Sequence, residues 1–280
     1  MNAEKRIRSE ARSLLAKGNW SKALAIFFIL FAGVMLVLFF QSVIVLGIQV
    51  VMTPLFNIVA KIEPSFSLDT ADSLGNTLMF LFQSAIGYFA YAAGFVFIFP
   101  LYCGVRRFFY LSSKGEEAGI SEVFYYLTQR LKQSILFGLR YGLICILKLL
   151  PCIAPAFFIT NAILTNEFGT LANSLLTLCV FITGLAGIAL WILWTSRQSL
   201  SMYLFIEDDS KPSAFYVKES ERITAGPLNN SMRRIMFSFA GWFLLALTGV
   251  GMLYFVPYFE MSVATSAKWI IKLQKEDCLL

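Results

Sequence analysis

The sequence predicts an all-α fold, a polytopic transmembrane helical bundle of six spans in three hairpins. Three observations predict it: the composition, the alternation of basic segments along the chain, and short amphipathic segments before the odd-numbered spans. Of the 280 residues, 58% are apolar and only 14% are charged, with a mean hydropathy of +0.71. A soluble protein is usually near half apolar and a quarter charged. We therefore expect residues 1–280 to form a single integral membrane domain.

The apolar runs define the expected spans. A helix needs about 20 apolar residues to cross the hydrocarbon core of a bilayer. Runs that approach or exceed this length predict spans at residues 23–51, 78–103, 135–163, 171–196, 234–250 and 252–271. The first run is too long for a signal peptide and has no small-residue cleavage site, so we expect it to stay as an uncleaved span.

The distribution of Lys and Arg predicts the orientation. Cytoplasmic loops of membrane proteins carry an excess of Lys and Arg. Of the 23 basic residues, 17 fall before the first span, between the second and third, and between the fourth and fifth. We therefore place these segments and the N-terminus in the cytoplasm. This asymmetry accounts for most of the net charge of +6, so the charge does not indicate nucleic-acid binding.

The last apolar run can be one span or two. A single crossing would place Lys268, Lys272 and Lys275 outside, against the positive-inside rule. A turn at Thr248-Gly249-Val250-Gly251 would divide the run and return these lysines to the cytoplasm. Six spans are favoured, and five remain the alternative.

Short amphipathic segments precede spans one, three and five. Ile7, Ala11, Leu14 and Leu15 share one helical face, and residues 120–131 follow the same spacing. Phe215, Tyr216 and Ile223 give a weaker stripe before span five. Such helices lie in the headgroup region with their basic residues over anionic lipid, or they pack on the inner mouth of the bundle. The sequence does not separate these alternatives.

Three ionisable residues lie within the expected spans: Arg140, Lys148 and Glu260. Charged groups at membrane depth are costly and mark functional sites by default. With six spans, Lys148 and Glu260 lie at comparable depth, which leads to the hypothesis that they pair or share a wet cavity with Arg140. With five spans, Glu260 is an outer interfacial acid and the pair does not form.

The sequence carries no catalytic signature. It has no His, which excludes Ser-His and Cys-His nucleophiles. The five Cys form no CxxC pattern, so we interpret them as free thiols in apolar runs. Phosphate-binding, dinucleotide-binding and zinc-protease motifs do not occur. We therefore expect no enzymatic activity, no catalytic residues, no cofactor and no metal.

Several stretches resemble a bacterial family of polytopic membrane proteins known as domain of unknown function 975. They include "GNWSKA" at 18–23, "SMYLFIEDD" at 201–209 and "FAGW…LTGVG…VPY" within 239–258. The hairpin between spans three and four is longer here and lacks the family's Ile-Pro-Gly turn. The resemblance implies placement in the bacterial inner membrane and no particular activity. The residues that carry it most closely are Gly18, Asn19, Trp20, Gly241, Trp242, Thr248, Gly249, Gly251, Pro257 and Tyr258.

These observations favour a non-enzymatic membrane scaffold or assembly protein that binds partners. The alternative is a small transporter or channel that uses Lys148 and Glu260. Membrane lipids are the expected partners, with other membrane proteins as further candidates. The sequence predicts neither the identity of a partner nor the oligomeric state.

Overall fold

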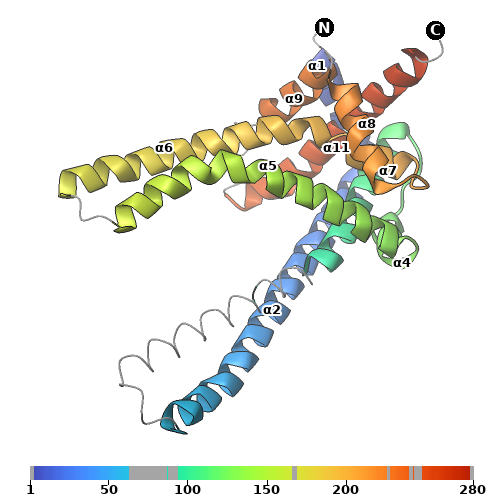
Figure 1. The fold of residues 1–280 in the computed structure, drawn as a ribbon. Coiled ribbons are helices and arrows are strands. Elements are labelled where there is room, and N and C mark those ends of the chain that lie inside the picture. The colour runs from blue at the N-terminus through green and yellow to red at the C-terminus, as the bar shows by residue number, and fades with distance from the viewer. Residues whose placement is uncertain are drawn as a thin grey trace.

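The computed structural model describes residues 3–62, 87, 94–165, 169–225, 228–239, 242 and 248–277. Every regular element within these residues is a helix, which confirms the all-α fold class. The helices form a packed part and two apolar parts that leave it in different directions (Figure 1). We call the packed part the head and the apolar parts the arms.

The head contains the short helices α1 (Ala3–Leu14), α4 (Tyr125–Thr128), α7 (Ser201–Glu207), α8 (Ser213–Thr224) and α9 (Leu228–Ser238). The long helix α11 (Val250–Asp277) and the helix Gly94–Lys114 run through it. Its core is rich in fully buried aromatic side chains, among them Phe108, Tyr126, Phe137, Phe205 and Tyr216. Large aromatic side chains contribute most of the burial energy in such cores.

The arms are the long helices beyond the head. The first arm is α2 (Trp20–Ile62), and the second is the pair α5 (Leu131–Thr165) and α6 (Thr170–Thr195). The two helices of the second arm are antiparallel, because Cys145 meets Trp191 and Cys152 meets Gly187. A Cβ added at Gly187 would lie 2.1 Å from the Cys152 carbonyl oxygen. The small residue therefore lets the two backbones approach closely.

Four helical stretches of the described residues are long and apolar enough to cross a membrane. They are Glu4–Gly47, Gly94–Lys114, Leu131–Ile163 and Ala172–Glu207. They overlap the first four expected spans. The second differs from expectation at its end, because the helix does not stop near Pro100 and Cys103 but continues to Lys114. Residues 78–86, in the first part of that expected span, lie outside the described residues.

The expected span at 252–271 is not among the four. The expected span at 234–250 lies partly outside the described residues, which do not include 240, 241 and 243–247. The chain does turn where the sequence predicted, at residues 248–251. The Gly251 N–H donates to Thr248 Oγ1 at 3.1 Å, and Gly249 has a φ of 71°, in the left-handed region that glycine adopts readily. However, residues 261–267 of α11 are all buried in the head. Residues 250–260 span only about 16 Å of helix, roughly half of the hydrocarbon core.

The amphipathic segments pack on protein. Ile7, Ala11 and Leu15 are buried, and α1 lies against α11. Val123 and Tyr126 of the second segment and Tyr216 and Ile223 of the third are buried too. Of the two alternatives that the sequence left open, the structure favours packing at the mouth of the helical assembly.

Candidate functional site

The three charged residues expected at membrane depth lie in different surroundings. Arg140 is exposed on α5. Lys148 Nζ forms an ion pair with Glu221 Oε1 of α8 at 3.0 Å. Glu260 Oε2 lies 3.4 Å from Arg106 Nε. The predicted pair between Lys148 and Glu260 is therefore wrong, because each group has a different partner within the head.

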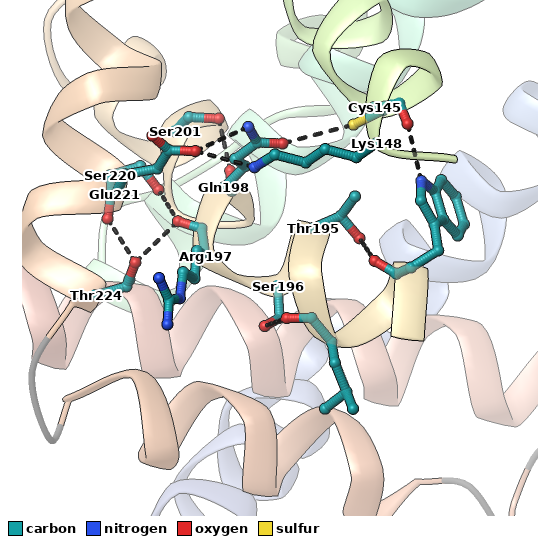
Figure 2. A network of polar contacts seen from close by, with 12 residues as sticks. Cys145, Lys148, Thr195, Ser196, Arg197, Gln198, Ser201, Ser220, Glu221 and Thr224 are labelled. Atoms are coloured by element: carbon teal, nitrogen blue, oxygen red, sulfur yellow. Dashed lines mark hydrogen bonds and ion pairs between the residues drawn. The ribbon is translucent and has the colours of Figure 1, made fainter. Parts of the chain in front are cut away.

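A polar network surrounds Lys148 where the second arm joins the head (Figure 2). The buried Gln198 side chain donates from Nε2 to Glu221 Oε1 at 3.1 Å, the same oxygen that Lys148 contacts. Its Oε1 accepts from the Cys145 thiol at 3.8 Å. Lys148 Nζ also lies 5.7 Å from the centre of the Trp194 ring, within the range of a cation–π contact. Glu221 thus binds the side chain of Lys148 from α5 and that of Gln198 from the turn after α6.

Backbone carbonyls extend this network. Ser220 Oγ and Thr224 Oγ1 of α8 both donate to the Arg197 carbonyl, at 2.8 and 2.9 Å. Arg233 of α9 donates from Nε to Ser196 Oγ at 2.8 Å and from a terminal nitrogen to the Leu193 carbonyl at 3.0 Å. Helices α8 and α9 therefore hold the end of α6 and the 3-10 turn Ser196–Gln198 that follows it. The network fixes the second arm to the head rather than presenting a reactive group.

The second charged site lies inside the head around Glu260. Tyr102 donates from its hydroxyl to Glu260 Oε1 at 3.3 Å. The Arg106 guanidinium lies over the rings of Tyr102 and Tyr203, at 4.8 and 5.4 Å from their centres. Glu260 is only 6% exposed. Because each charge would be costly here alone, the pair and its aromatic cage must be maintained together.

A small cavity of about 100 Å³ adjoins Glu260. Its walls are otherwise mainly apolar: Ala23, Ile26, Phe27, Leu30, Tyr102, Val105, Phe109, Val256 and Pro257. The volume and the polar groups fit a few water molecules better than an organic substrate.

Two further acids connect the ends of the chain within the head. Glu10 of α1 contacts Lys268 Nζ at 2.6 Å and accepts from Trp269 Nε1 at 2.9 Å. Glu207 at the end of α7 binds both Lys114 and Lys275. The C-terminal lysines therefore lie among segments that the charge distribution assigned to the cytoplasm.

The residues that carry the family resemblance partly meet in space. The Trp20 ring lies 5.1 Å from Tyr254, and the Trp242 ring lies 5.9 Å from Tyr254 and 6.0 Å from Tyr258. These contacts join the start of α2 to α11 across most of the chain. Thr248, Gly249 and Gly251 form the turn described above. The packing gives these positions a structural role.

The remaining positions of that set act locally. Gly18 has a φ of 90° at the kink between α1 and α2, and the Asn19 side chain donates to the Leu14 carbonyl at 3.1 Å. Pro257 lies within α11 and is buried. Gly241 lies outside the described residues.

Three of the central polar residues, Arg106, Gln198 and Glu221, were not singled out from the sequence. In the charge distribution Arg106 is one of the basic residues between the second and third expected spans. The signal for it was the spacing of Tyr102 and Arg106, four residues apart on one helical face next to an apolar run. Gln198 and Glu221 lie in polar segments where nothing distinguishes them from solvated residues.

No family model, curated protein or solved structure matches this chain. The resemblance to the domain of unknown function 975 therefore stays a prediction. What the structure defines, over the residues that it describes, is an all-helical fold with four helices that are long and apolar enough to span a membrane.

Proposed function

We propose that this chain is a non-enzymatic scaffold of the bacterial inner membrane, and that its arms receive the membrane helices of partner proteins. The observation that carries the proposal is the exposure of the arms. No residue of the most apolar window of Leu131–Ile163 is buried, and only 11% and 6% of the corresponding windows of Glu4–Gly47 and Ala172–Glu207 are. Apolar surface of this extent is found where lipid or another protein covers it.

The divergence of the arms supports partner binding over a closed bundle. Helix α2 and the pair α5–α6 leave the head in different directions (Figure 1). Apolar helices gain little from the hydrophobic effect by meeting each other in lipid, so small residues and packing decide their contacts.

The ion pairs of four acids support a rigid head. Glu221, Glu260, Glu207 and Glu10 each bind groups from another element of the chain. The Glu221 contact ties the base of the second arm to α8, and the other three join elements of the head to one another. A scaffold needs such a fixed geometry more than it needs a reactive centre.

The chain ends support an even number of crossings with both ends in the cytoplasm. Glu10 of α1 and Lys268 of α11 are in contact, which supports the placement of these two residues on one side of the membrane. Four spans satisfy this condition, and so do six. Five spans do not, because an odd number would separate the two ends.

Site-specific photocrosslinking in native membranes tests the proposal. A photoreactive residue at Leu36 of α2, or at Phe158 or Phe181 of the second arm, replaces a strongly exposed apolar side chain. We expect discrete protein adducts of defined mass from at least one position on each arm. The exposed head residue Lys218 is the control position. Adducts with lipid alone at all arm positions would contradict partner binding.

A small transporter is the second candidate, favoured by the buried pair of Arg106 and Glu260 beside a cavity. Cysteines placed at Ala23 and Val256, which line that cavity, report on water access from either side of the membrane. Labelling from both sides would support transport. Protection of both positions in the folded protein would count against it.

A further inference from the structure

A groove of about 640 Å³ lies where α5, α6 and α9 meet. Its length follows α6 from Thr183 to Trp194, which is about 16 Å along a helix. Half of the hydrocarbon core is roughly 15 Å deep. A groove of this length matches the depth of a single leaflet.

The long walls of the groove are apolar. They consist of Pro151 and Pro155 of α5 and Ala186, Leu190 and Leu193 of α6. Leu190 is 59% exposed, so part of this wall is not covered by the protein itself. Acyl chains are the apolar ligands that a membrane supplies at this place.

Two arginines, Arg197 and Arg233, also line the groove, both at the α9 side where α6 ends. The two hydrogen bonds of Arg233 to Ser196 and Leu193 hold its guanidinium in place and leave its other N–H groups for a ligand. Arg197 is exposed, while its backbone carbonyl is held by Ser220 and Thr224 (Figure 2). The guanidinium group matches the geometry of phosphate oxygens.

The charged side chains that line the groove are both basic, Arg197 and Arg233. None of the described residues that line it is acidic. The nearby acid Glu221 is already bound by Lys148 and Gln198, and Glu4 lies 4.0 Å from Arg234 rather than at the groove. Both arginines belong to a segment that the charge distribution assigns to the cytoplasmic side, where anionic lipid headgroups are found.

We propose that this groove binds one anionic phospholipid of the cytoplasmic leaflet. Arg197 and Arg233 contact the phosphate, and an acyl chain lies along Pro151, Pro155 and Leu190. This site is independent of the scaffold function, because it requires only that the second arm enters the membrane.

Native mass spectrometry of the delipidated protein in detergent tests the site. The probes are phosphatidylglycerol, phosphatidylcholine and inorganic phosphate. We expect one phosphatidylglycerol per chain to bind at least five-fold more tightly than phosphatidylcholine, about 1 kcal/mol of discrimination. Equal binding of the two lipids would overturn the proposal. So would competition by inorganic phosphate at the concentration of the lipid, because the site would then recognise a free anion.

Two variants examine the two ends of the groove. Arg197→Gln removes the exposed charge without removing a hydrogen bond of Arg233, and we expect at least five-fold weaker phosphatidylglycerol binding. Ala186→Trp fills the apolar part and should weaken binding similarly. The matched controls are Lys218→Gln, an exposed cation elsewhere, and Ile182→Trp, an exposed α6 position that does not line the groove.

The variants also separate a site from a folding defect. Thermal unfolding of each variant is measured in parallel, and Arg197→Lys, which keeps the charge, should recover part of the affinity. Unchanged binding in Arg197→Gln or in Ala186→Trp would overturn the proposal. Loss of binding in the controls to the same degree would overturn it as well. None of these results depends on whether the arms crosslink to partner proteins.

Discussion

Helix α5 places the same residue type in two opposite environments. Phe137, at the head end, is 1% exposed and stacks on Phe205 with ring centres 4.7 Å apart. Phe157, in the arm, is 66% exposed. The head therefore hides its apolar residues within the chain, whereas the arm depends on lipid or a partner. The difference shows that one apolar helix can contribute to the packed core at one end and expose its apolar side chains at the other.

The largest expected effect compares these two phenylalanines. Phe137→Ala should destabilise the protein by about 3–5 kcal/mol, the range for truncating a buried phenylalanine. Phe157→Ala should change the stability by less than about 0.5 kcal/mol, as for an exposed position. Thermal and denaturant unfolding in detergent measure both. Equal losses for the two variants would show that the arm contributes as much to the folded core as the head does.

The buried pair in the head gives the next effect. Glu260→Gln leaves the Arg106 charge without its counter-charge, and we expect a loss of roughly 3 kcal/mol. The matched control is Glu117→Gln in an exposed loop, which should be close to neutral. A double variant, Arg106→Met with Glu260→Gln, should lose less than the sum of the single variants. Strictly additive losses would contradict a direct pair.

Several elements could be predicted from the sequence because each depends on local pattern. The apolar run at 135–163 falls within α5, the run at 171–196 matches α6 to within one residue, and the glycines at 249 and 251 marked the turn at the start of α11. The partner of Glu260 could not be predicted. It depends on how α11 packs against the helix Gly94–Lys114, and that arrangement is set by contacts between residues far apart in the sequence.

The spans at the C-terminal end show a second limit. Hydropathy measures whether a residue avoids water, and both lipid and a protein core satisfy this preference. Met261, Val263 and Ala264 are apolar because the head encloses them. The predicted pair of Lys148 and Glu260 failed for a different reason. It depended on the depth of each residue along its own helix, and depth does not determine which helix lies beside it.

The junction between the second arm and the head should respond less strongly than its core. Glu221→Gln weakens the contacts to Lys148 and Gln198, and Glu221 is 43% exposed, so we expect a loss of about 1 kcal/mol. Spin labels on α6 and on α8 should also report a broader distance distribution, because this contact fixes the arm. Arg140→Gln on the exposed face of the same α5 is the control and should change neither measurement. A distance distribution identical to that of the unmodified protein would contradict an anchoring role.

The smallest effect concerns Glu219 on α8, at the surface of the head. The Arg222 guanidinium donates to its carboxylate at 2.6 and 2.9 Å, and with Gln274 it lowers the pKa of Glu219 below the usual value. A carboxyl with a lowered pKa stabilises the folded state above its unfolded pKa of about 4.3, and this contribution disappears as the pH falls through the folded pKa. Arg222 is 65% exposed, so solvent screens the pair and the contribution stays below about 0.5 kcal/mol. We therefore expect Arg222→Gln to lower the unfolding temperature slightly at pH 7 and by less at pH 3.5. A larger difference at the lower pH would contradict this sign.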